Sequence, residues 1–213
     1  MIIHLCSNET TSNSYLIAEG SSALLIDAGD AEKARKLLLS HSWTLDMILL
    51  THEHVDHISG LEEIRSMTGA PVVSSDICSY RIGDARGNLS PVYDLLAYSY
   101  TGNVCKDRHD PFICRPCEVV FQTQTDLRWQ GHVFHMQLCP GHSPGSSTIL
   151  MDNRFLFTGD YFLPDMPVNL DLPGSSKTDY LQKTEPWFEK ILHPGMTLFP
   201  GHGSPYMYHN KSL

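Results

Sequence analysis

The most informative stretch of this chain, for its fold and for its chemistry, is Thr51-His52-Glu53-His54-Val55-Asp56-His57. It brings three imidazoles and the Asp56 carboxylate into six consecutive positions. Imidazole and carboxylate are the ligands of hydrolytic metals such as zinc. The apolar run before it, Met47-Ile48-Leu49-Leu50, is typical of a buried strand, so the cluster is expected at a strand end rather than in an ordinary polar loop. We therefore predict a metal site here.

Three more segments place a histidine or an aspartate where a predicted strand gives way to a turn. They are Pro140-Gly141-His142-Ser143-Pro144-Gly145, Thr158-Gly159-Asp160 and Pro200-Gly201-His202-Gly203. Glycine lets the backbone turn tightly and approach other groups closely at such points. Each segment alone is a weak signal, because a single histidine at a strand end is usually structural. Together with the first cluster they indicate one metal centre assembled from distant parts of the chain.

With these motifs in order, the chain resembles the metallo-β-lactamase-fold hydrolases, and among them the short glyoxalase II-like proteins. The matching residues are Asp27-Ala28-Gly29, the His52-x-His54-x-Asp56-His57 signature, Pro140 to Gly145, Gly159-Asp160 and Gly201-His202. The resemblance covers about Tyr15 to Gly203. It implies an α/β fold with a four-layer αββα sandwich and a single domain over residues 1–213. The irregular, Gly- and Pro-containing residues 76–118 are expected to form a loop-rich, partly helical insertion.

The resemblance also implies two metal ions, most simply two Zn²⁺, with iron or manganese as alternatives. The first ion would take three histidines, His52, His54 and His142. The second would take an aspartate and two histidines, Asp56, His57 and His202. Asp160 would bridge the two ions. Asp27 would hold the histidine-rich loop in place, as the outer contacts of metal sites generally do.

Charge counting indicates the chemistry of such a site. Two divalent cations carry +4, and two carboxylates with a bridging hydroxide remove three, which leaves a site suited to an oxyanion. Zinc lowers the pKa of bound water to about 7, so hydroxide is available to attack a carbonyl carbon. Asp56 is the candidate catalytic residue that orients this hydroxide. No separate general acid is evident, which favours good leaving groups, as in thioesters and lactones.

Two departures from true glyoxalase II affect the expected substrate. Ser146 replaces the family's second histidine after the Gly-His-Ser-Pro-Gly turn, and Asn169 stands where an arginine is expected. A general thioesterase or acyl hydrolase acting on a small acyl substrate is therefore the main hypothesis. A lactonase of the same fold, a mononuclear iron persulfide dioxygenase and an inactive binding protein are the alternatives.

A second possible metal motif is Cys105-x3-His109-x4-Cys114-x2-Cys117. The Cys-x2-Cys pair suits a structural zinc ion. The first spacing is unusual, and the simpler interpretation is a set of reduced thiols packed in a loop. The sequence leaves both interpretations open.

Bulk properties limit the partners. The 213 residues carry a formal net charge of -9, which disfavours nucleic acid and anionic membranes as partners. The N-terminal residues lack a basic segment followed by a long apolar one, and no apolar run approaches the roughly 18 residues of a membrane helix, so the cytoplasm is the expected location. The six cysteines are then expected to be reduced. Exposed aromatic residues are compatible with a homodimer.

Periodicity predicts helices over residues 31–40, 60–67 and 178–192. The second of these is expected to begin with a capping box, Ser59-Gly60-Leu61-Glu62. Short strands are predicted at residues 15–18, 23–27, 47–50, 71–73, 119–121, 132–138, 148–151, 155–157 and 197–199.

Overall fold

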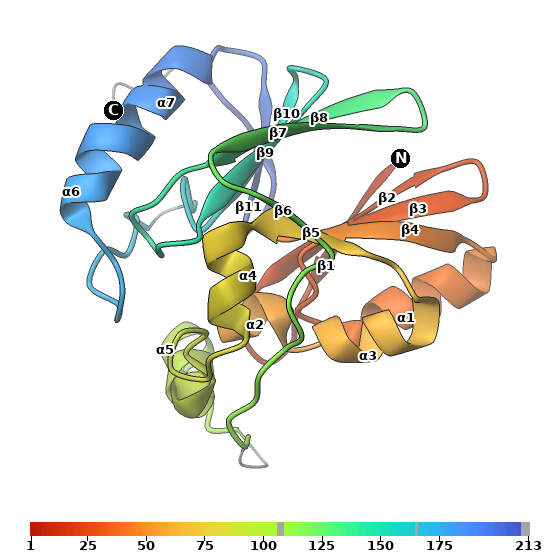
Figure 1. The fold of residues 1–213 in the computed structure, drawn as a ribbon, viewed down its shortest axis with the longest axis horizontal. Helices are drawn as coiled ribbons and strands as arrows, with labels where there is room; N and C mark the ends of the chain where they lie inside the picture. The colour runs from red at the N-terminus through yellow and green to blue at the C-terminus, as the bar shows by residue number, and fades with distance from the viewer. Residues whose placement is uncertain (106–108, 165, 210–213) are drawn as a thin grey trace.

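The computed structural model describes residues 1–105, 109–164 and 166–209 and consists of two facing β-sheets with helices on their outer sides (Figure 1). The first sheet contains, in spatial order, β1 (Ile2–Cys6), β2 (Asn13–Glu19), β3 (Ser22–Ile26), β4 (Thr44–Leu49), β5 (Val72–Ser75) and β6 (Val119–Phe121). The second contains β12 (Tyr206–Met207), β11 (Thr197–Pro200), β10 (Phe155–Gly159), β9 (Ser147–Met151), β8 (His132–Leu138) and β7 (Gln124–Trp129). The chain therefore completes one sheet before it starts the other.

Antiparallel pairs open the first sheet, whereas β3 to β6 pair in parallel. Parallel neighbours need a crossover, and helices supply it. The crossover elements of this half are α1 (Ala31–His41), α2 (Val55–Ile58), α3 (Leu61–Thr68), α4 (Asp76–Ile82), η1 (Ser90–Val92) and α5 (Tyr93–Thr101). In the second sheet β10 and β11 pair in parallel. The crossover between them contains α6 (Lys177–Asp179), the π-helical turn η2 (Tyr180–Thr184) and α7 (Glu185–Ile191).

Three apolar clusters fill the spaces between the four layers. The cluster between the sheets includes Ile26, Leu49, Phe134, Ile149 and Phe157. A second cluster joins the outer face of the first sheet to α1 and α3, and a third joins the outer face of the second sheet to α7. Figure 1 shows α1 and α3 on one outer side and α6 and α7 on the other. The predicted αββα sandwich is thus confirmed.

Local details differ from the sequence predictions at the start of α3. The expected capping box is wrong: α3 begins at Leu61, and Gly60 in the N-cap position offers no side chain. Ser59 still has helical backbone angles as the C-cap of α2. Its hydroxyl instead donates a 2.8 Å hydrogen bond to the Gly29 carbonyl, which ties α2 to the end of β3. The tertiary contact therefore outweighs the local capping pattern.

The predicted helix over residues 178–192 is interrupted by η2, and three strands were not predicted at all: β1, β7 and β12. Strand β7 has the sequence Gln-Thr-Asp-Leu-Arg-Trp, whose side chains alternate between exposed and partly buried until Trp129. Such a polar edge strand carries little hydrophobic signal. No helix in the described ranges is both long and apolar enough to cross a bilayer.

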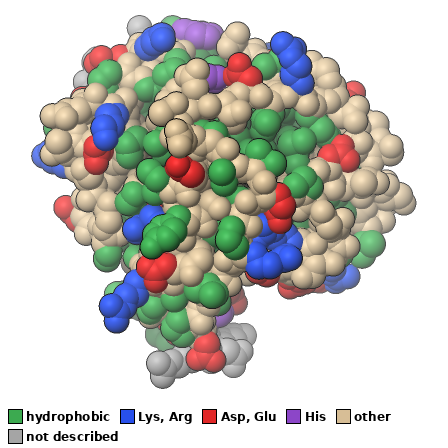
Figure 2. All heavy atoms as spheres, in the orientation of Figure 1, with side chains coloured by type: hydrophobic (Ala, Val, Ile, Leu, Met, Phe, Trp, Pro, Cys, Tyr) green, Lys and Arg blue, Asp and Glu red, His purple; other side chains and the backbone are tan. Residues whose placement is uncertain are grey.

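Helix α5 and the described residues that follow it protrude from the sandwich (Figure 1). Figure 2 shows hydrophobic side chains on this lower protrusion. The large exposed hydrophobic side chains among its described residues are Leu95, Tyr98, Val104 and Ile113.

Candidate metal centre

The predicted donors converge at one edge of the sandwich. The histidine-rich segment follows β4 directly and continues into α2, while His142, Asp160 and His202 follow β8, β10 and β11. All seven side chains are almost completely buried, none of the residues being more than 4% exposed: His52, His54, Asp56, His57, His142, Asp160 and His202. The turns after four strands thus bring together every residue that the sequence nominated.

One group of donors is formed by His52, His54 and His142, each of which offers a nitrogen within 4.8 Å of the others. The Nδ1 atom of His142 lies 3.0 Å from the Asn169 carbonyl, which can only accept, so this nitrogen carries the proton. The Nε2 atom of the same ring points inward, 2.9 Å from His54 Nδ1. Burial, and then the neighbouring His142, lower the pKa of His54 to about 3, so His54 is neutral at pH 7, as a ligand must be.

Asp56, His57 and His202 form a second group within the same 4.8 Å limit. His202 Nε2 lies 3.2 Å from Asp56 Oδ2. The ring of His202 is stacked on Tyr100 of α5, with 4.1 Å between centroids. Burial, followed by the Asp160 and Asp56 charges, raises the pKa of Tyr100, so its phenol stays protonated at neutral pH. Through Tyr100, the insertion therefore supplies one wall of this site.

Asp160 faces both groups. Its Oδ1 atom lies 3.3 Å from His57 Nε2, and its Oδ2 atom lies 3.3 Å from His142 Nε2. A glycine at position 201 makes this approach possible, because a Cβ atom there would collide with Asp160 Oδ1. One carboxylate thus connects the two donor groups.

The buried donors face one another, as in the pair His202 Nε2 and Asp56 Oδ2, but most of them make no hydrogen bond within the described part of the protein. Among the described residues, seven buried side-chain atoms have no hydrogen-bond partner, and six belong to this centre: His52 Nε2, His54 Nε2, Asp56 Oδ2, His57 Nε2, Asp160 Oδ1 and His202 Nε2. Buried polar atoms are normally paired, since leaving one unpaired costs roughly 1–3 kcal/mol. Divalent metal ions coordinated by these side chains would compensate for this cost. The residues present therefore fit a metal centre.

The charges of the centre lead to the same conclusion. Burial disfavours the charged form of His57, but the charges of Asp56 and Asp160 outweigh it and raise the pKa of His57 well above its ordinary value. Burial also disfavours the charged form of Asp160, but three histidines outweigh it and lower the pKa of Asp160 well below its usual range: His202, His57 and His142. The two carboxylates thus give the cavity a strong preference for positive charge.

Asp27 holds the histidine-rich loop, as expected. Its Oδ1 atom accepts a 2.7 Å hydrogen bond from the Thr51 backbone, and its Oδ2 atom accepts one of 2.7 Å from the Thr51 hydroxyl. The same Oδ2 atom accepts from His57 Nδ1 at 3.0 Å, which turns His57 Nε2 toward the centre. Asp27 has a left-handed backbone (φ 56°), a strained conformation that persists only where surrounding contacts fix it.

Glu53 and Arg81 form a buried pair that sequence reasoning missed. The Glu53 side chain is fully buried; its Oε1 atom accepts from Arg81 Nε at 2.7 Å, and its Oε2 atom accepts from the Ser143 hydroxyl at 2.9 Å. Burial raises the pKa of Glu53, and Arg81 opposes this shift. The pair links the histidine-rich loop to α4 and to the turn that carries His142. A carboxylate between two ligand histidines was the only local signal, and the position of Arg81 depends on the fold.

Replacement of Arg81 by alanine is expected to leave a buried carboxylate without its cation. Breaking a buried pair on one side costs about 3–5 kcal/mol, and we expect about 3 kcal/mol because the Arg81 side chain is 22% exposed. Denaturant unfolding of the purified variant measures this loss. Arg86→Ala removes an exposed arginine of the same segment and should change stability by less than about 0.5 kcal/mol. Equal losses in the two variants would contradict the assignment.

The four-residue cysteine and histidine motif is divided by the fold. Cys105 and His109 meet near Asp94, whereas Cys114 is buried against the first sheet. Cys117 lies with the Ser74 hydroxyl, 3.1 Å from its sulfur. A single zinc site made by the whole motif is therefore wrong, because the two halves of the motif face different parts of the molecule.

The fold and its buried histidine and aspartate donors place the chain among the metallo-hydrolases. Residues 8–202 match the family model described as Metallo-beta-lactamase superfamily. The chain therefore belongs to the metallo-β-lactamase superfamily, as the sequence motifs indicated.

Individual relatives agree with this assignment. A hydroxyacylglutathione hydrolase of Cereibacter sphaeroides is 40% identical over 176 residues, which cover 71% of this chain and 66% of that protein. A probable metallo-hydrolase of Streptococcus pyogenes is 28% identical over 94% of this chain and 83% of its own length. In three dimensions the chain is similar to the B3 metallo-β-lactamase BLEG-1, with a TM-score of 0.80 and 24% identity over 97% of this chain and 94% of that one. The sequence relatives support the glyoxalase II-like branch.

Proposed function

We propose that this protein is a dinuclear metal-dependent hydrolase that cleaves a thioester or a related ester. In this proposal His52, His54 and His142 bind one ion, and Asp56, His57 and His202 bind the other. Asp160 bridges them, since its two oxygens face histidines of both groups. Zn²⁺ is the proposed metal, because imidazole and carboxylate without thiolate are common ligands of catalytic zinc, and iron and manganese accept the same donors.

The single observation that carries the proposal is the set of six buried donor atoms without a hydrogen-bond partner, four on histidines and two on carboxylates. Two bound divalent ions would supply an activated water at neutral pH and a Lewis acid for the carbonyl oxygen. The protein itself would contribute by fixing the positions of the ligand side chains. Asp27 orients His57, and the Asn169 carbonyl orients His142. Asp56 would accept a hydrogen bond from the attacking water in this proposal.

The substrate class rests on a relative and on the local chemistry. The relative with 40% identity is named for hydroxyacylglutathione, which is a thioester. A thiolate leaves without protonation, which suits a centre in which no general acid is evident. Asn169 Oδ1 accepts from the Asp171 backbone at 3.0 Å and so closes its own turn. This supports an acyl hydrolase without glutathione selectivity, because no guanidinium stands at that position.

The test combines metal analysis of the purified protein with a panel of thioesters, lactones and phosphodiesters. The wild-type protein should hold about two more ions per chain than a His54→Ala/Asp160→Ala variant, and only the wild type should hydrolyse thioesters. Full activity in the variant, or a wild-type protein that binds no metal, would refute the proposal. Oxygen uptake with a persulfide and one iron per chain would assign the protein to the alternative oxidoreductase class.

A further inference from the structure

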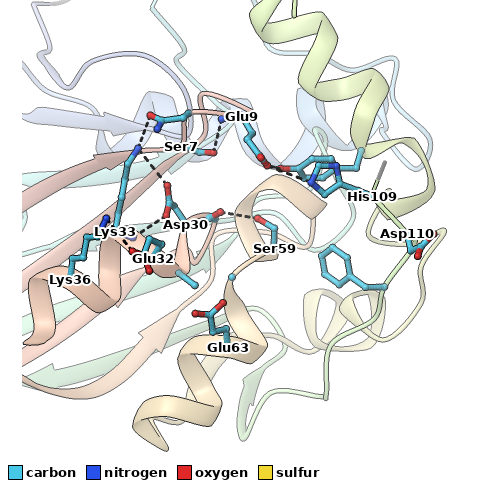
Figure 3. Close-up of a pocket in the computed structure, with 16 residues that line it drawn as sticks. Ser7, Glu9, Asp30, Glu32, Lys33, Lys36, Ser59, Glu63, His109 and Asp110 are labelled. Carbon is cyan, nitrogen blue, oxygen red and sulfur yellow. Dashed lines mark hydrogen bonds and ion pairs between the residues drawn. The ribbon is translucent and has the colours of Figure 1, made fainter. Parts of the chain in front are cut away.

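A second cluster of metal-binding side chains lies outside the candidate metal centre. Asp94 of α5, Cys105 and His109 each offer a ligand atom within 4.8 Å of the others. His109 Nδ1 lies 2.7 Å from Asp94 Oδ1, and His109 Nε2 lies 3.6 Å from Glu9 Oε2. Glu9 belongs to the loop between β1 and β2 and is itself fixed by a 2.8 Å hydrogen bond from the Tyr93 hydroxyl. Figure 3 shows the Glu9 carboxylate directed at His109.

We propose that Asp94, Cys105, His109 and Glu9 form a separate divalent metal site, with Zn²⁺ as its natural occupant. A thiolate, an imidazole and carboxylates are the donors that zinc takes in four-coordinate sites. These side chains come from the loop after β1, the start of α5 and the segment after α5, and together they offer a sulfur, a nitrogen and two acids. The site differs from the candidate metal centre in one decisive respect, because it alone contains sulfur.

The electrostatic setting of Cys105 favours a cation. The carboxylates of Asp94 and Glu9 face the two nitrogens of His109, and the Cys105 sulfur lies within 4.8 Å of the ligand atoms of Asp94 and His109. Two carboxylates beside a thiol and an imidazole attract a divalent cation, and metal ligation deprotonates a thiol. All three residues of the closest group are only partly exposed. A hollow of about 570 Å³ is lined in part by Glu9 and His109, so the cluster borders it on one side (Figure 3).

Occupancy of this site would fix the position of α5. The ion would join the N-terminal loop at Glu9 to both the start of α5 at Asp94 and the segment after it at Cys105 and His109. Tyr100 lies on α5 between these points and is stacked on His202 of the candidate metal centre. The second site would therefore hold the wall of the active-site pocket in place without touching the reacting groups.

Cobalt substitution separates the two sites, because Co²⁺ bound to a thiolate has a near-ultraviolet charge-transfer band that histidine and carboxylate ligands lack. The full-length protein loaded with Co²⁺ should show this band. The band should persist in His54→Ala/Asp160→Ala, which destroys only the candidate metal centre, and it should disappear in Cys105→Ser with the loss of about one ion per chain. Asp94→Asn should weaken cobalt binding at this band.

Matched variants make the result decisive. Cys117→Ser removes a thiol of the same sequence motif that packs elsewhere, and Cys6→Ser removes an exposed thiol; both should keep the band. Absence of the band from the wild type, or its survival in Cys105→Ser, would overturn the proposal. Since the band does not depend on the histidine and aspartate centre, failure of this site and failure of the proposed hydrolase are distinguishable.

Discussion

Substitution of Asp160 by alanine is expected to abolish the hydrolytic activity, lowering kcat/KM on the order of 10³-fold or more, a size typical of losing a major electrostatic contributor to transition-state stabilisation. The physical reason is that the two oxygens of Asp160 face both donor groups, at 3.3 Å from His57 Nε2 and 3.3 Å from His142 Nε2. Without it, five buried histidines and Asp56 remain to share two dications. The metal content should therefore fall together with activity.

Steady-state kinetics with the best thioester of the panel, combined with metal analysis, measures this effect. Asp126→Ala is the matched control, since this exposed carboxylate pairs with His135 on the second sheet, away from the donors. It should retain wild-type kinetics and metal content. An Asp160→Ala protein with two tightly bound ions and normal kcat would show that the carboxylate does not bridge them.

Substitution of Asp27 by alanine is expected to weaken metal binding by about 10–100-fold, the usual effect of losing a residue that orients metal ligands. Asp27 accepts hydrogen bonds from the Thr51 backbone, the Thr51 hydroxyl and His57 Nδ1. Its loss frees the His57 ring to rotate and releases the start of the histidine-rich loop. Competition with a chromophoric chelator measures the affinity of the two ions.

Asp46→Ala serves as the control for this variant. Asp46 is an aspartate of β4 that accepts a 2.7 Å hydrogen bond from Trp129 Nε1, so its removal also costs a partly buried contact. It should lower stability without changing metal affinity. Equal weakening of metal binding in the two variants would mean that general destabilisation, rather than the orientation of His57, causes the loss.

The donors were predictable because their signals are local. Histidines and aspartates beside glycines at strand ends are visible in the sequence, and glycine is required at position 201 by the close approach of Asp160. The layered fold was predictable for a similar reason, since buried strands such as β3 and β4 are continuous apolar runs. The division of the donors into two groups came from the family resemblance, and no spacing rule could have supplied it.

Other parts of the site depend on tertiary placement alone. Tyr100 reaches His202 only because α5 folds back over the centre, and no period in residues 76–118 indicates that path. Arg81 meets Glu53 across 28 positions, and Asp94 joins Cys105 and His109 in place of the two cysteines that the motif implied. In each case the partner lies in the insertion, where sequence patterns specify the path of the chain least.

The placement of the donors on both sheets has a consequence for folding. Each group combines residues of the first half, such as His52 or Asp56, with a residue of the second half, His142 or His202. Bound ions would therefore act as cross-links that close chain loops of roughly 90 and 145 residues, a length at which restricting the unfolded chain has a large entropic effect. Removal of the ions by a chelator would then lower the free energy of unfolding as well as stop catalysis. The supply of metal would therefore affect how long the protein stays folded.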